Sequence, residues 1–256
     1  RLRLGIGHLL SRNRCSGHQL EKLVGHITWA ALLRRESLSI LSGCYRFMRE
    51  CGTREVTLWP VVARELRQFS ALLPLVCAFT NLAWSPVASI SDSSSYGYAI
   101  LEKNVGCEVS GRWGRHAEKW RYRHEDSTRA REHALRDPLC IDPASLGPLP
   151  APLSGDADPE FEEIDRDILM DGDWKFLYAS QWHRREDILR TEGRAMLWGA
   201  RHKLRNPENF NMRHVLLVDN LGLALACGKG RAASPHLAPV LRSLCALSPC
   251  TGTKFS

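Results

Sequence analysis

No apolar run in this chain of 256 residues reaches the length of a membrane span. Two runs, Leu23–Leu33 and Ala71–Phe79, are shorter than the ~20 residues that a transmembrane helix needs, and His26 and Pro74 interrupt them. The amino-terminal segment also lacks the pattern of a secretory signal. The sequence therefore predicts a soluble, intracellular protein, cytoplasmic or nuclear, that is not secreted and has no membrane partner.

Paired cysteines are lacking as well, because none of the nine cysteines belongs to a C-x-x-C motif. This excludes a zinc ribbon and a thioredoxin-like redox centre. The odd number and the scattered positions favour free thiols in a reducing compartment. The sequence also has no G-x-x-x-x-G-K-[ST] phosphate loop and no G-x-S-x-G elbow, so nothing indicates a P-loop nucleotidase or a serine hydrolase.

What the chain does have is positive charge. Its 35 Lys and Arg residues outnumber its 28 Asp and Glu residues, which gives a formal net charge of +7 and a pI near 9.1. Such a balance favours an anionic partner, most simply nucleic acid. Hydrophobic residues make up 44% of the chain and charged residues 25%, and these proportions are typical of a folded globular protein.

The first part of the chain predicts helices. Apolar residues recur every three or four positions between Cys15 and Glu50, which places them on one face of a helix. Gly52 is expected to end this helical stretch, and Pro60 stands where it could open another helix.

After Trp84-Ser85-Pro86 the pattern changes to strands and helices in alternation. Val87–Ser91 and Gly97–Leu101 predict two strands joined by a serine-rich turn, as in a hairpin. Three further elements are expected downstream, namely a strand at 174–182, a helix at 186–204 and a strand at 215–218. This succession predicts an α/β fold.

Three acidic residues stand at or near the ends of these elements. Asp92 follows the first strand, Asp219 follows the last strand, and Glu192 lies in the helix between. Carboxylates gathered at one sheet edge form an oxygen-rich site suited to Mg²⁺, and close carboxylates coexist cheaply only with a cation between them. The alternative is that such acids cap helices, as Asp219 could do for the helix that follows it.

Three motifs in this region resemble the ribonuclease H domain of retroelements. Asp92–Ala99 is similar to the D-A-S-x-x-G-x-G turn that opens that domain, and Ile188–Ala195 is similar to the I-N-x-x-E-x-x-A segment of its first helix. Val218-Asp219-Asn220, followed by Gly228-Lys229-Gly230, resembles a segment of DIRS-type elements and related families. The three motifs occur in the order that the family has.

The amino-terminal part resembles the reverse transcriptase that precedes this domain. Leu23–Ala30 is similar to the L-x-G-x-L-x-W-A helix of the thumb, and Leu58-Trp59, Glu65-Leu66 and Trp84-Ser85-Pro86 resemble the connection into ribonuclease H. The resemblance implies three parts, which are a helical thumb remnant at 1–56, a connection at 57–86, and a ribonuclease H-like domain at 87–256 with an insertion at 103–173 and a truncated carboxyl terminus.

The fold that the resemblance implies is an α/β ribonuclease H-like mixed sheet with flanking helices, preceded by a small helical remnant. The activity is Mg²⁺-dependent endonucleolytic hydrolysis of the RNA strand of RNA–DNA hybrids, with Mn²⁺ as a possible substitute. Asp92 would bridge two ions, and Glu192 and Asp219 would each hold one. Contacts to the nucleic acid would come from Ser94, Asn220, Lys229 and Arg231, and an upstream polymerase domain would be the partner in the same polyprotein.

The sequence also departs from the family pattern. Ser93 and Ala99 replace the usual Ala and Gly of the first turn, and no counterpart of the family's fourth metal-site Asp is found before Ser256. Two alternatives therefore stay open. One is an inactive nucleic-acid-binding remnant of a degenerate retroelement, and the other is a different nuclease or recombinase of the ribonuclease H fold.

Overall fold

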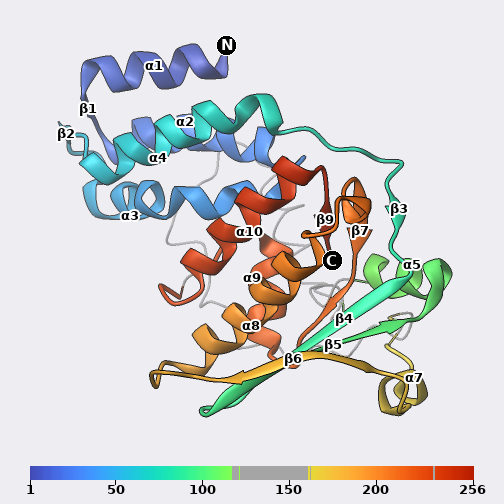
Figure 1. Cartoon of the computed structure of the whole chain (residues 1–256). Coiled ribbons are helices and arrows are strands. Elements are labelled where there is room, and N and C mark those ends of the chain that lie inside the picture. Colours follow the sequence, from blue (N-terminus) through green and yellow to red (C-terminus); the bar gives the residue numbers. More distant parts are fainter. Residues whose placement is uncertain (117–120, 122–160, 162, 233) are drawn as a thin grey trace.

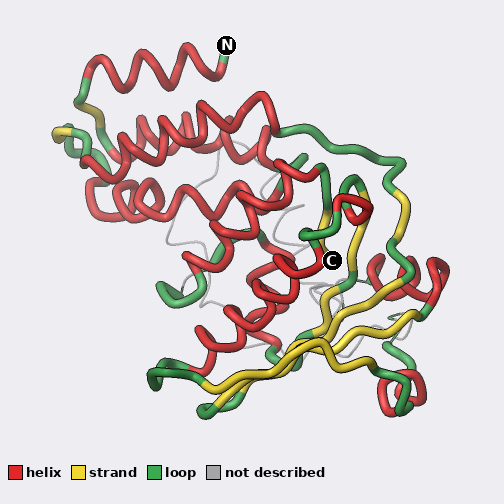
Figure 2. Tube along the Cα trace, viewed as in Figure 1, coloured by secondary structure: helices red, strands yellow, loops and turns green. Residues whose placement is uncertain are grey.

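The computed structural model describes residues 1–116, 121, 161, 163–232 and 234–256. These residues form a mixed α/β structure in which an amino-terminal group of helices lies beside a sheet covered by further helices (Figures 1 and 2). The α/β class predicted from the alternating pattern is therefore confirmed.

The amino-terminal helical unit consists of four α-helices, two short antiparallel strands and two 3-10 helices. Its elements are α1 (Leu2–Arg12), β1 (Arg14–Cys15), α2 (Gly17–Ala31), the 3-10 helix η1 (Arg35–Leu41), α3 (Ser42–Cys51), β2 (Val56–Thr57), α4 (Pro60–Leu72) and η2 (Leu73–Leu75).

Local signals in the sequence account for the ends of these helices. The side chain of Ser16 accepts a hydrogen bond from the backbone N–H of Gln19, whose own side chain accepts from the N–H of Ser16, so a capping box starts α2. Gly52 ends α3 with a φ of 51°, and Pro60 is the first residue of α4. Both of the latter positions were predicted from the sequence.

One hydrophobic core holds the helical unit together. It includes Ile6, Ile27, Phe47, Leu58 and Phe69, which are all buried. Because this core continues through α4, the packed helical unit extends beyond residue 56, where the sequence placed the boundary between the thumb-like part and the connection.

The main sheet has four strands in the order β6-β5-β4-β8. Strands β4 and β5 are antiparallel, β5 and β6 are antiparallel, and β8 runs parallel to β4. A smaller parallel sheet has the order β3-β7-β9. The strands are β3 (Ala83–Trp84), β4 (Val87–Ser93), β5 (Gly97–Asn104), β6 (Lys175–Gln181), β7 (Met212–His214), β8 (Leu216–Leu217) and β9 (Lys254–Phe255).

Helices α8, α9 and α10 lie on the same side of the main sheet (Figure 1). They share a second core that includes Met196, Leu223 and Leu241. The helices are α8 (Ile188–Lys203), the 3-10 helix η5 (Pro207–Asn209), α9 (Leu221–Lys229) and α10 (Ala238–Thr251). A third, smaller core around Ala88 and Trp113 includes α5 (Gly106–Arg115).

The insertion expected at 103–173 is described only in part. It begins inside β5, and its described residues form α5 and α7 (Arg166–Met170). Lys103 Nζ lies 2.8 Å from Asp171 Oδ2, so the end of β5 is tied to the far side of the insertion. The rest of the insertion, at 117–120, 122–160 and 162, lies outside the described residues.

Two buried side chains join the helical unit to α10. Glu65 is 1% exposed and accepts hydrogen bonds from the backbone N–H groups of Gly43 at 3.0 Å and Cys44 at 2.9 Å. Arg242 of α10 also donates to Glu65 at 2.9 Å. Arg34 donates to the carbonyl of Thr253 at 2.7 Å.

A glycine marks a second close contact between the two parts. Gly230 ends α9 in the left-handed conformation, with a φ of 68°. A Cβ atom at this position would lie 1.9 Å from the carbonyl oxygen of Arg35 in η1. Both the backbone conformation and the space therefore require glycine here.

No helix within the described ranges is long and apolar enough to cross a bilayer.

Replacing Glu65 with alanine should lower the free energy of unfolding by about 3 kcal/mol, because it removes the acceptor of a buried, charge-assisted network. Urea denaturation at equilibrium would measure the change. The matched control is Glu50→Ala. Glu50 pairs with Arg46 on an exposed helix face, and its loss should cost less than about 1 kcal/mol. Equal losses in the two variants would contradict this role of Glu65.

Candidate functional site

Asp92 lies near the end of β4, opposite Ala99 of β5. Its side chain is exposed, and Oδ1 accepts a hydrogen bond from the backbone N–H of Ser93 at 2.6 Å. Neighbouring Ser93 is opposite Tyr98, whose ring packs on Trp198 of α8. Because successive side chains of a strand point to opposite faces of the sheet, the side chain of Asp92 leaves β4 on the face that α8 does not cover.

Glu192 lies in the second turn of α8 and is half-buried. Its Oε2 atom is buried and has no hydrogen-bond partner in the described part of the chain. A buried polar atom without a partner lowers the stability of the folded state, so a hydrogen-bond donor or a cation at Oε2 would stabilise this carboxylate.

Asp219 is exposed and lies two residues before the start of α9. The sequence suggested that it could cap this helix, but the cap is Asn220, whose Oδ1 accepts from the backbone N–H of Leu223 at 3.0 Å. A carboxamide oxygen satisfies the free N–H groups of a helix start as well as a carboxylate does. Asp219 is therefore left with no capping role.

The three acids affect one another through their charges. The pKa of Glu192 is raised above its ordinary value of 4.5, first by burial, then by the charge of Asp219, and to a smaller extent by Asp92 and Asp187. A hydrogen bond with the side chain of Asn220 acts in the opposite direction. Asp219, which follows β8, and Asp92, near the end of β4, are thus both within electrostatic reach of Glu192 in α8.

The arrangement of Asp92, Glu192 and Asp219 fits a metal ion only in part. In the described portion, no group of three His, Cys, Asp or Glu side chains is placed so that it could hold an ion. Two observations still fit a cation, namely the partnerless Oε2 of Glu192 and the repulsion between the carboxylates. A divalent ion would relieve both.

The four residues expected to touch nucleic acid lie in two places. Ser94 is in the β4–β5 turn beside Asp92, and its hydroxyl accepts from the N–H groups of Tyr96 and Gly97, both at 3.2 Å. Asn220 lies beside Glu192, as described above. Both are therefore near the acids.

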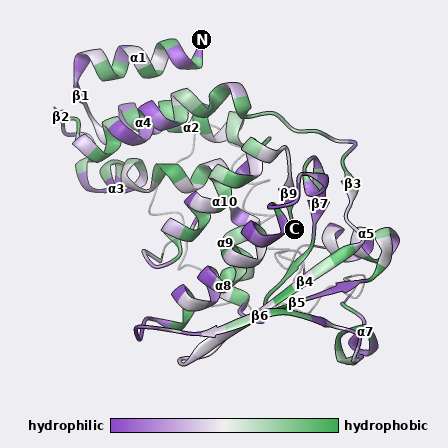
Figure 3. Cartoon of the chain, in the orientation of Figure 1, coloured by the Kyte–Doolittle hydropathy of each residue, from purple (hydrophilic) through white to green (hydrophobic). Residues whose placement is uncertain are grey.

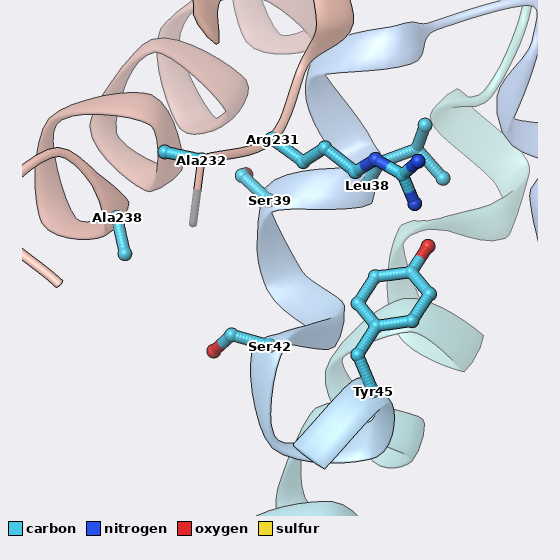
Figure 4. A pocket seen from close by; sticks show the side chains of 7 residues that line it. All are labelled: Leu38, Ser39, Ser42, Tyr45, Arg231, Ala232 and Ala238. Atoms are coloured by element: carbon cyan, nitrogen blue, oxygen red, sulfur yellow. The ribbon is translucent and has the colours of Figure 1, made fainter. Parts of the chain in front are cut away.

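Lys229 and Arg231 lie at the opposite end of α9 from Asp219. A helix of nine residues is about 13 Å long. The guanidinium of Arg231 lies over the ring of Tyr45, 5.3 Å from its centroid, beside a small pocket between the helical unit and the start of α10 (Figure 4). The structure thus separates Lys229 and Arg231 from the carboxylates.

Comparison of the chain with protein-family models, with curated proteins and with solved structures found no match.

Sequence reasoning missed a group of aromatic residues next to the acids. Tyr98, Trp182 and Trp198 pack together with Arg194. Part of this group could have been found in the sequence, because Arg194, Trp198 and His202 are spaced four apart and therefore share one face of α8.

The raised pKa of Glu192 predicts a pH-dependent effect on stability. A carboxyl group whose pKa is higher in the folded state contributes stability below its unfolded pKa and loses that contribution as pH rises through the folded value. Glu192→Gln should therefore stabilise the protein relative to the native chain, and this gain should grow as pH rises above the unfolded pKa of a glutamate, about 4.3, until Glu192 is ionised in the folded state.

Urea denaturation of both proteins across this range would measure the difference. Glu108→Gln is the control, because it makes the same substitution at an exposed position of α5, and it should not show the increase expected of Glu192→Gln. A constant difference for Glu192→Gln would contradict the repulsion inferred here.

Proposed function

We propose that this protein hydrolyses the RNA strand of RNA–DNA hybrids in a Mg²⁺-dependent reaction, as the ribonuclease H-like part of a retroelement reverse transcriptase. The observation that carries the proposal is the electrostatic convergence of Asp92, Glu192 and Asp219, with one buried Glu192 oxygen left without a partner. Such a grouping is costly unless a cation is bound, so its presence favours a function that uses one.

The topology of the sheet supports the proposal. Three antiparallel strands in sequence order are followed by α8 and then by β8, which pairs in parallel with β4. A mixed sheet with flanking helices is what the motif resemblance implies for the proposed ribonuclease H-like fold. The observed sheet places the ends of β4 and β8 side by side, so the acids that lie at or after them come from adjacent strands.

In this proposal Asp92, Glu192 and Asp219 hold the metal ions. When bound, Mg²⁺ would supply activation of water and stabilisation of the departing 3′ oxygen. The protein's own residues have supporting roles. Asn220 positions Glu192 through its side chain, and Ser94 fixes the turn after Asp92.

A second candidate function is nucleic-acid binding without catalysis, by an inactive remnant of the same fold. The orientation of Asp92 favours it, because no group of three acids in the described chain is placed to hold an ion. The chain is basic enough for either function.

Cleavage of a labelled RNA–DNA hybrid in Mg²⁺ would test the proposal. Asp92→Asn should reduce the cleavage rate by two or more orders of magnitude without changing the thermal unfolding temperature, because it removes a ligand charge from an exposed side chain. Asp173→Asn, which changes an exposed acid before β6, should cleave at the native rate.

Three outcomes would count against hybrid cleavage as the function. Undiminished cleavage by Asp92→Asn would end the assignment of the site. Absence of cleavage by the folded native chain would favour the inactive remnant. Faster cleavage of duplex DNA than of the hybrid would favour another nuclease of the same fold class.

A further inference from the structure

A compact group of aromatic rings lies where the edge strand β6 meets α8. The ring of Tyr98 lies 4.6 Å from that of Trp182, which directly follows β6, and 4.6 Å from that of Trp198 in α8. The Trp182 and Trp198 centroids are 5.4 Å apart. The guanidinium of Arg194 covers both indoles, at 5.1 and 5.4 Å. We refer to Tyr98, Trp182, Trp198 and Arg194 as the ring cluster.

The ring cluster is a surface feature and not part of the interior. Its three rings belong to none of the three hydrophobic cores of the described chain, and each is only partly buried. Strand β6 is also an edge of the sheet, since within the described ranges only β5 pairs with it. Hydrophobic colour follows β4, whereas α8 carries hydrophilic bands (Figure 3). Because the three rings are only partly buried, part of their surface is open to solvent.

Hydrogen bonds hold one ring of the cluster in place on the β4–β5 turn. Trp182 Nε1 donates to the carbonyl of Ser94 at 3.1 Å and to Ser93 Oγ at 3.2 Å, and its backbone N–H donates to the carbonyl of Tyr96 at 2.8 Å. Tyr96 itself is 73% exposed. Trp182 is thus fixed to the turn that carries the exposed Tyr96, and this turn lies at one end of the sheet (Figure 1).

Arginines lie on the segment of chain that carries the ring cluster. One acid of this segment, Glu186, is engaged by Arg194 at 2.5 Å and by Arg190 at 3.7 Å. Further arginines on the same strand-to-helix connection and on α8 are exposed, namely Arg184, Arg185 and Arg201. The surface therefore combines aromatic faces with an excess of guanidinium groups.

We propose that the ring cluster, extended by Tyr96, binds an unpaired strand of nucleic acid. Bases would stack on the accessible faces of Tyr96 and Trp182, and phosphates would pair with Arg184 and Arg185. Binding of this kind needs no metal ion and does not depend on hybrid cleavage at the carboxylates.

The chemistry of the surface favours a single strand over other ligands. The bases of a duplex are already stacked and paired, so their faces are not available to protein rings. A proline-rich peptide also docks on aromatic grooves, but it would make no use of the surrounding arginines. Stacking together with phosphate pairing uses both parts of the surface.

Fluorescence anisotropy of a labelled oligothymidylate, with EDTA present to exclude metal-dependent steps, would test the proposal on the full chain. Tyr96→Ala and Trp182→Leu should each weaken binding by about tenfold, as expected for loss of one stacked base. Trp182→Phe should restore most of the affinity because it keeps a ring. Arg185→Gln should reduce the salt dependence of binding by about one unit of slope.

Two variants serve as matched controls. Trp29→Leu changes a ring that is 77% exposed on α2, and Arg64→Gln changes an exposed guanidinium on α4. Both should bind the oligonucleotide as the native chain does. Because Tyr96 is exposed in a turn, its variant keeps the test valid even where Trp182→Leu fails to fold.

Several results would overturn the proposal. Among the variants, these are unchanged affinity in Tyr96→Ala and folded Trp182→Leu, or an equal loss of affinity in Trp29→Leu. For the folded native chain, they are absence of binding, tighter binding of duplex than of single strand, or displacement of the oligonucleotide by a proline-rich peptide. The variant Asp92→Asn separates the two functions, because it should lose hybrid cleavage and keep single-strand binding.

Discussion

Two buried charged side chains, Glu65 and Arg34, hold the helical unit and the sheet-bearing part of the described chain in one arrangement. Glu65 receives two backbone N–H groups of α3 and the guanidinium of Arg242, while Arg34 reaches the carbonyl of Thr253 after α10. Both therefore act on α10, which packs against α8. Since α8 carries Glu192, the geometry of the acidic site depends on an interaction made on the other side of the molecule.

The acidic site and the ring cluster use opposite physical means on the same helix. Glu192 is destabilised in its charged form by burial and by Asp219, whereas Arg194, two residues later, is neutralised by Glu186 and lies on two indoles. One side of α8 thus favours a cation, and the adjacent side offers cations and rings to an anionic, aromatic ligand.

Local features of the fold were predictable from the sequence, and long-range features were not. Two strand-like runs on either side of a serine-rich turn predicted the β4–β5 hairpin. Gly52 and Pro60 marked helix ends, because glycine tolerates a positive φ and proline fits the first turn of a helix. The sequence could not tell which residue caps α9, because Asp219 and Asn220 are equally good caps in chemical terms, and the structure has Asn220 in this position. The ring cluster could not be foreseen, since Tyr98 and Trp182 meet only through the pairing of β5 with β6.

The glycine at the end of α9 has a mechanical consequence. The backbone of Gly230 touches Arg35 so closely that any side chain would force α9 and η1 apart. Helix α9 is rigid and begins at Asn220, beside Glu192. One end of α9 is therefore in fixed contact with the helical unit, and the other end lies beside the carboxylates. A displacement of η1 would move α9 along its axis and shift the residues next to Glu192.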